Sequence, residues 1–263
     1  MSNRIDEKFQ QLKAQNKKAL ITYISAGDGG LDLTEKAVLE MEKNGADIIE
    51  IGVPFSDPIA EGPVIQEASL RSLRDYHTTL KSVFAMVEKL RTQTDMPLLL
   101  MLYANTVYRT PDFFEQCRKV GIDGVIIPDL PFEEHDEFRE AAEKNNIYNI
   151  SLVTPASTGR IEKIASVAQG FLYCVSSVGV TGMREKFDTD FNAFFAEVAK
   201  YSKIPYCVGF GIRNGEAAQK MGSYCDGVIV GSAVVNQIGQ YQQDALPHVA
   251  ALCQDLRNGL NQA

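Results

Sequence analysis

Residues 47–63 read DIIEIGVPFSDPIAEGP, an apolar run that leads directly into a loop stiffened by prolines. Side chains alternate between the two faces of a strand, so Glu50 shares one face with Ile48 and Gly52. The opposite face carries only branched apolar side chains, which suit packing against helices. The segment therefore predicts a covered strand whose Glu50 points away from the helices, into the centre of a barrel.

Segments of the same kind recur along the whole chain. Short apolar runs that end at Gly, Pro or Asp are typical of parallel strands covered by helices. Eight are found: Ala19–Ser25, Asp47–Val53, Pro97–Tyr103, Gly124–Pro128, Tyr148–Val153, Gly170–Val175, Pro205–Gly209 and Gly227–Val230. Amphipathic segments lie between them, for example Leu33–Asn44, whose apolar residues recur every three or four positions.

Eightfold alternation of strand and helix predicts the α/β class and a (β/α)8 TIM barrel, since 263 residues suit one closed barrel. Residues 1–263 are expected to form a single domain, because no linker or repeat divides them. An extra helix, Ile5–Ala14, precedes the first strand and could plug the barrel floor. A doubly wound open sheet is the alternative.

Composition excludes several functional classes. A net charge of −8 argues against a nucleic-acid-binding surface. The five cysteines are spread without a C-x-x-C pair and the three histidines are isolated, so neither a metal site nor a disulfide framework is expected. The chain start lacks an apolar signal-peptide core, and the most apolar stretch, Met96–Ala104, is too short to span a membrane. A cytoplasmic protein is expected.

Two carboxylates mark one rim of the predicted barrel. Glu50 lies near the carboxyl end of its strand, the end where barrel enzymes keep their chemistry. Glu61 follows after Pro54 and Pro58 have forced an extended loop, so both could act on one substrate as an acid/base pair. Asp57 competes with Glu61 for that role, and solvated carboxylates are the alternative for all three.

Glycines follow three neighbouring strands near the C-terminus. The segments are Gly179-Val-Thr-Gly182, Gly209-Phe-Gly-Ile212 and Gly231-Ser232, the last of which opens a helix. Glycines let backbone N–H groups approach an anion, and a helix N-terminus adds partial positive charge. Because barrels commonly hold phosphate after strands seven and eight, the pattern predicts a phosphate site. Glycines needed only for turns are the alternative.

These motifs resemble those of the tryptophan synthase alpha chain family. The resemblance is carried by Glu50-Ile-Gly-Val-Pro-Phe-Ser-Asp-Pro58 with Gly62-Pro63, Ser25-Ala-Gly-Asp28, Leu102-Tyr-Ala-Asn105, Pro128-Asp-Leu-Pro131, Tyr173-Cys-Val-Ser-Ser-Val-Gly-Val-Thr-Gly182, Gly209-Phe-Gly-Ile212 and Gly231-Ser-Ala-Val234. The matches run in order through nearly the whole chain. They imply a (β/α)8 barrel that cleaves indole-3-glycerol phosphate by a retro-aldol reaction without a cofactor of its own.

The resemblance also implies residue roles. Glu50 matches the catalytic glutamate, and the indole pocket falls at Tyr23, Met101 and Tyr103. Further substrate-binding positions are Tyr173, Thr181, Gly182, Phe210, Gly211, Gly231 and Ser232. The family's partner is a β subunit, which carries the pyridoxal phosphate of an αββα complex. The expected partner-contact residues are Pro54, Phe55, Asp57 and Asn105.

Glu61 departs from the family pattern, which has an aspartate that holds the indole N–H. Glutamate keeps the charge but adds about 1.5 Å of reach. We expect either that the loop is set back to compensate or that the chain is a slow lyase. Two alternatives to an efficient lyase stay open: a catalytically weak subunit that mainly activates β, or another phosphate-sugar barrel isomerase.

Overall fold

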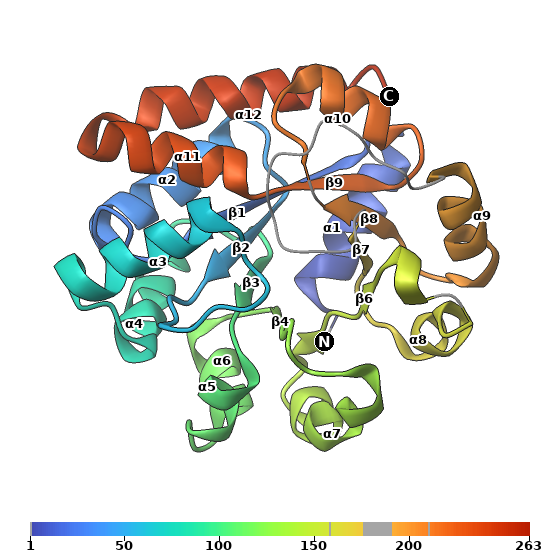
Figure 1. Cartoon of the computed structure of the whole chain (residues 1–263), viewed down its shortest axis with the longest axis horizontal. Coiled ribbons are helices and arrows are strands. Elements are labelled where there is room, and N and C mark those ends of the chain that lie inside the picture. Colours follow the sequence, from blue (N-terminus) through green and yellow to red (C-terminus); the bar gives the residue numbers. More distant parts are fainter. Residues whose placement is uncertain (1, 158, 176–190, 210) are drawn as a thin grey trace.

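The computed structural model describes residues 2–157, 159–175, 191–209 and 211–263. Its strands form one parallel sheet in the order β5-β4-β3-β2-β1-β9-β8-β7-β6. The strands are β1 (Ala19–Ser25), β2 (Ile48–Gly52), β3 (Leu98–Met101), β4 (Gly124–Ile126), β5 (Tyr148–Asn149), β6 (Leu152–Val153), β7 (Leu172–Val175), β8 (Tyr206–Gly209) and β9 (Gly227–Val230). Figure 1 shows them at the centre, with helices around them.

Short β5 and β6 close the ring. They are the two ends of the single strand expected at Tyr148–Val153, which the structure divides. Ile150 N–H donates to the Val125 carbonyl at 2.9 Å, and Tyr173 N–H donates to the Ser151 carbonyl at 3.0 Å. The segment therefore bonds to β4 on one side and to β7 on the other, as a TIM barrel requires and an open sheet does not.

Helices follow the strands in sequence. The α-helices are α1 (Arg4–Ala14), α2 (Leu31–Lys43), α3 (Pro63–Tyr76), α4 (Leu80–Leu90), α5 (Ala104–Tyr108), α6 (Phe113–Val120), α7 (Asp136–Lys144), α8 (Ile161–Val167), α9 (Phe191–Tyr201), α10 (Gly215–Gly222), α11 (Ser232–Tyr241) and α12 (Leu246–Leu260). Short 3₁₀ turns occur at η1 (Phe132–Glu134), η2 (Pro155–Ser157) and η3 (Gln242–Asp244). No helix in these described ranges is long and apolar enough to cross a membrane.

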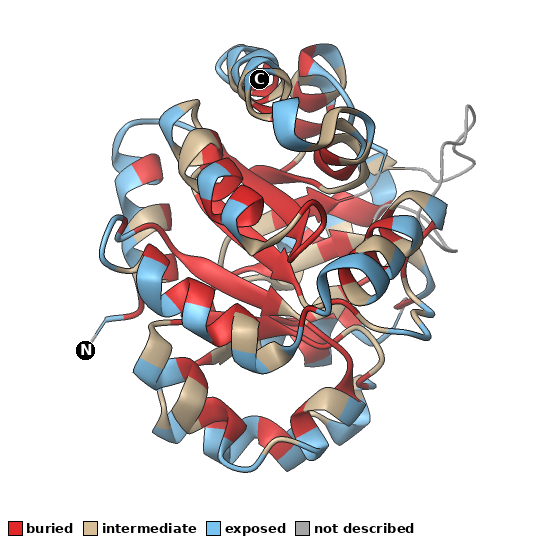
Figure 2. Cartoon of the chain, turned by 90° about the vertical axis from the view of Figure 1, so that its left-hand side faces the viewer, coloured by how far each residue is buried: buried red, intermediate tan, exposed pale blue. Residues whose placement is uncertain are grey.

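The strands separate two apolar layers. Ile48 packs in the barrel interior, whereas Ile49 and Ile51 pack in the outer layer beneath the helices. Figure 2 shows the buried strands under helices that are exposed on their outer faces. The prediction that Glu50 shares the inward face of β2 is therefore confirmed, because strand side chains alternate.

Helix α1 fills the barrel floor, as predicted. Ile5, Phe9 and Leu12 join the interior cluster formed by the inward strand residues. Asn3 caps the helix by accepting a hydrogen bond from Ile5 N–H at 3.0 Å. The side-chain amide of Asn3 also donates to the Asp123 carbonyl at 2.9 Å, which ties the helix to the barrel.

Candidate active site

Glu50 lies inside the barrel rather than on its outer surface. It pairs in register with Tyr23 on β1 and Leu99 on β3, and it is 1% exposed. Its Oε1 atom has no hydrogen-bond partner among the described residues. Burial raises the pKa of Glu50 to about 8, because the charged form loses its hydration. A carboxyl group with a pKa near neutrality can both donate and accept a proton.

Two tyrosines from other strands face Glu50. Burial raises the pKa of Tyr173, and the nearby charge of Glu50 raises it further. Burial also raises the pKa of Tyr23, with smaller contributions from the charges of Glu61 and Glu50 that a hydrogen bond to Ser25 opposes. Both phenols therefore stay protonated and present neutral O–H groups to the interior.

Two glycines make room for these rings, a role that the sequence motifs do not reveal. A Cβ atom on Gly52 would lie 2.0 Å from the Tyr23 hydroxyl, and one on Gly209 would lie 2.6 Å from the Tyr173 ring. Real Cβ contacts are essentially never this short, so larger residues would displace the tyrosines. The inward alternation of each strand could have indicated both glycines.

Glu61 is buried at the same end of the barrel, with 6% of its surface exposed. Its Oε2 atom accepts a short hydrogen bond from the Tyr103 hydroxyl. Burial raises the pKa of Glu61, although the bond from Tyr103 and backbone N–H groups partly offsets this effect. Asp57 is exposed, and its carboxylate accepts a hydrogen bond from Ser56 at 2.5 Å. Of the two competing loop acids, Glu61 therefore faces the interior.

The expected indole pocket lies between these groups. Met101, at the end of β3, packs against both the interior cluster and the small cluster that contains Tyr23. Tyr103 follows β3 and directly precedes α5 as its N-cap residue. Asp129 occurs in the Pro128-Asp-Leu-Pro131 motif, but the sequence assigned it no role; it holds the start of α5 by accepting a hydrogen bond from Ala104 N–H at 2.9 Å. Its charge also contributes to the raised pKa of Glu61, so it belongs to the same rim.

The expected phosphate site is described in part. Gly231 precedes α11, which begins at Ser232, and a Cβ atom on Gly231 would lie 3.6 Å from the Tyr23 side chain. The first N–H groups of a helix lack intrahelical acceptors and favour an anion. Gly211 has a φ of +73°, which favours glycine. Thr181, Gly182 and Phe210 lie outside the described residues.

Three of the expected partner-contact residues lie in the loop that carries Glu61, and the fourth, Asn105, lies in α5. Pro54 is buried, whereas Asp57 and Asn105 are exposed. Phe55 is half-buried and stacks on Tyr103 with ring centroids 4.7 Å apart. A surface residue is thus in direct contact with the side chain that binds Glu61.

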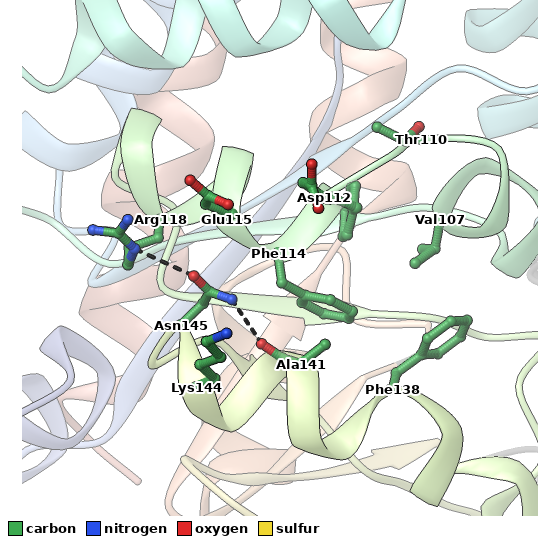
Figure 3. Close-up of a pocket in the computed structure, with 11 residues that line it drawn as sticks. Val107, Thr110, Asp112, Phe114, Glu115, Arg118, Phe138, Ala141, Lys144 and Asn145 are labelled. Carbon is green, nitrogen blue, oxygen red and sulfur yellow. Dashed lines mark hydrogen bonds between the residues drawn. The ribbon is translucent and has the colours of Figure 1, made fainter.

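A separate cavity of about 760 Å³ is lined by residues of α5, α6 and α7, which Figure 3 draws as sticks. Phe114 and Phe138 lie on its apolar side, and Arg118 donates a hydrogen bond to Asn145 at 3.2 Å across its charged side. None of the expected site residues that the structure describes lines it. Across the described ranges, no cluster of His, Cys, Asp and Glu is suited to a metal ion.

Known proteins of one family resemble this chain over nearly its whole length. The profile of the family described as tryptophan synthase alpha chain matches residues 9–261. The tryptophan synthase alpha chain of Thermoanaerobacter sp. (strain X514) is 43% identical over 262 residues, which cover 98% of this chain and 100% of the relative. That of Alkaliphilus metalliredigens is 46% identical over 240 residues, covering 90% of each.

A solved structure of the same family matches this chain in fold. The crystal structure of tryptophan synthase subunit alpha from Legionella pneumophila str. Paris superimposes with a TM-score of 0.90 at 36% identity. The match covers 100% of both chains. The likeness therefore extends to the whole barrel, including the rim that carries Glu50 and Glu61.

Proposed function

This chain belongs to the tryptophan synthase alpha chain family, and we propose that Glu50 and Glu61 carry out its lyase reaction. That reaction cleaves indole-3-glycerol phosphate into indole and glyceraldehyde 3-phosphate, in tryptophan biosynthesis. The observation that carries the proposal is the buried carboxyl of Glu50, unpaired at Oε1 among the described residues, with a pKa raised to about 8. A group in this state can exchange protons with a bound substrate in both directions.

The proton balance of the cleavage suits one carboxyl group of this kind. The bond between the indole ring carbon and the glycerol side chain breaks once that ring carbon has gained a proton. The adjacent side-chain hydroxyl then loses its proton as the aldehyde carbonyl forms, and the electrons of the broken bond restore the aromatic ring. Glu50 gives the first proton and takes the second, so it ends the cycle in its starting state.

Glu61 has a different task in the proposal. Positive charge develops on the indole nitrogen while the ring carbon is protonated, and a carboxylate that accepts the N–H hydrogen bond stabilises that charge. Glu61 is buried on the same rim and already holds one hydrogen bond through Oε2. Tyr23, Met101 and Tyr103 would enclose the indole ring, and Tyr173 would lie beside Glu50.

Phosphate binding is assigned to backbone groups at the carboxyl ends of the last strands. The start of α11 at Gly231 and Ser232 offers N–H groups that have no acceptor within the helix, and the left-handed Gly211 lets the chain approach an anion closely. Thr181, Gly182 and Phe210 complete the proposed set. No Lys or Arg occurs in Gly209–Ile212 or Gly231–Val234, so the anion would be held mainly by the backbone.

The partner of the proposed enzyme is the tryptophan synthase β subunit. We assign it an αββα complex in the cytoplasm, in which pyridoxal phosphate belongs to β and this chain acts as one barrel domain without a cofactor. Pro54, Phe55, Asp57 and Asn105 form the proposed contact surface. Because Phe55 stacks on Tyr103, docking at this surface would act directly on the residue that binds Glu61.

Release of indole from indole-3-glycerol phosphate, measured with and without a β subunit, tests the function. Turnover by the isolated chain that increases on adding β supports the proposal. A chain that releases no indole alone but stimulates β would instead be a binding activator. Turnover of a different phosphate sugar, without cleavage of the indole substrate, would identify an isomerase.

A further inference from the structure

The Tyr103 hydroxyl has all of its hydrogen-bonding capacity occupied. It accepts N–H hydrogen bonds from Ile59 at 2.8 Å and from Ala60 at 2.9 Å. A phenol has one proton and two acceptor sites, so these two bonds fill both acceptors. The remaining proton therefore points at Glu61, in agreement with the short bond between the two side chains.

Tyr103 is itself held firmly in place. Its side chain is 4% exposed, and its backbone joins the end of β3 to the start of α5. The ring of Phe55 stacks on the ring of Tyr103 at an interplanar angle of 23°. A hydroxyl on so constrained a ring fixes both the loop at residues 59–60 and the carboxylate that follows it.

We propose that Tyr103 is a positioning residue that sets the reach of Glu61. The bond to Oε2 draws the longer side chain back towards β3 and so fixes how far the carboxylate extends towards the substrate. The N–H groups of Ile59 and Ala60 bind the same hydroxyl, so Tyr103 fixes the position of the loop together with that of the Glu61 side chain. This inference rests on the proposed role of Glu61 in the lyase reaction.

Tyr103→Phe tests the inference, because it keeps the stacked ring and removes only the hydroxyl. We expect kcat to fall by about 10-fold or more, the lower end of the effect of a hydrogen bond to a charged group. KM should change little, since the apolar wall of the pocket is retained. Purified full-length protein and saturating indole-3-glycerol phosphate give both constants.

Glu61→Asp supplies the second arm of a double-mutant cycle. A carboxylate about 1.5 Å shorter no longer reaches the Tyr103 hydroxyl. Tyr103→Phe should therefore lower kcat in the Glu61 background and have little effect in the Glu61→Asp background. An equal loss in both backgrounds would overturn the proposal, because the hydroxyl would then act through the loop or the pocket wall alone.

Tyr148→Phe is a matched control at the opposite end of the barrel. The Tyr148 hydroxyl donates to the carboxylate of Asp6 at 2.6 Å, so the same kind of bond is removed. This variant should lose stability and keep kcat. A wild-type chain that fails to cleave the substrate would refute the proposed function, whereas an active wild type without coupling between Tyr103 and Glu61 refutes only this inference.

Discussion

The two ends of the barrel differ in how their buried carboxylates are hydrogen-bonded. At the floor, the Asp123 carboxylate accepts hydrogen bonds from Arg4 at 2.8 Å, from Arg91 at 2.7 Å and from Leu98 N–H at 2.9 Å. At the rim, Glu50 is equally buried but has an oxygen without a partner among the described residues. The buried carboxylate at the floor is therefore fully hydrogen-bonded, whereas the one at the rim keeps an oxygen that can bond to a ligand.

The difference has an energetic consequence. One pKa unit corresponds to about 1.4 kcal/mol, so raising the pKa of Glu50 from 4.5 to about 8 opposes folding by several kcal/mol once the group is ionised. A paired carboxylate such as Asp123 avoids that penalty as long as its partners remain. Stability is therefore concentrated at the floor, and reactivity at the rim.

The largest expected effect comes from Glu50→Gln, which keeps the shape and removes proton transfer. We expect kcat/KM to fall by roughly 10²- to 10⁴-fold, the range for a positioned acid/base group. The KM for indole-3-glycerol phosphate should change far less than kcat. Near-normal turnover would move the acid/base role away from Glu50.

The same variant should show the stability difference between the two ends. The folded-state pKa of Glu50 is raised, so its contribution to stability is complete below about pH 4.5 and is lost as the pH rises towards 8. Glu50→Gln should therefore be more stable than wild type at pH 9 and similar to it near pH 4. Chemical denaturation at both pH values measures this, and a variant less stable at pH 9 would contradict it.

The second effect tests the floor. Asp123→Asn keeps the volume of the side chain but leaves Arg91 buried without its anion, and Arg4 loses its partner as well. Removing one member of a buried ion pair typically costs about 3–5 kcal/mol of unfolding free energy. Turnover at a temperature where the variant is folded should match wild type. A large fall in kcat without a loss of stability would show that Asp123 contributes to turnover and not to stability, contrary to the proposed difference between floor and rim.

The third effect concerns the anion site at the rim. Gly231 has a φ of −108°, so a side chain there introduces no left-handed strain. Valine would crowd the approach to the start of α11, and we expect KM to rise by roughly 10-fold or more through loss of charge-assisted backbone hydrogen bonds. Gly231→Ala is the gentler control, since its Cβ fits 3.6 Å from Tyr23. Unchanged binding of glycerol 3-phosphate by the valine variant would refute the assigned site.

Local patterns made most of the fold predictable. Ala19–Ser25 and Gly227–Val230 are strands over the predicted residues, because a run of buried apolar side chains depends mainly on its own sequence. The division of Tyr148–Val153 into β5 and β6 was not predicted. The Asn149 side chain is buried there without a hydrogen-bond partner among the described residues. The pattern of apolar residues does not reveal this buried polar group.

The candidate site was predictable residue by residue but not contact by contact. Alternation along β2 predicted that Glu50 points inward. The sequence of the following loop left two candidates for the second carboxylate, Asp57 and Glu61. The bond between Tyr103 and Glu61 joins residues 42 positions apart, and that between Arg4 and Asp123 joins residues 119 apart. Pairings at such separations depend on the closed barrel, so they become visible only when the fold is known.

The smallest expected effect comes from Glu61→Asp. This variant tests whether the residues around position 61 are adapted to glutamate rather than to aspartate. Aspartate keeps the charge, so the loss should stay below the roughly 10²-fold that a misplacement near 1 Å can cause. It should still reach about 10-fold, because the shorter carboxylate loses the charge-assisted bond from Tyr103 and retreats from the indole N–H. The loop would not follow, since Ile59 and Ala60 remain bonded to Tyr103. Measured kcat/KM for the two enzymes tests this directly. A Glu61→Asp variant faster than wild type would mean that the rim still fits the shorter acid and that Glu61 is a poorly accommodated replacement.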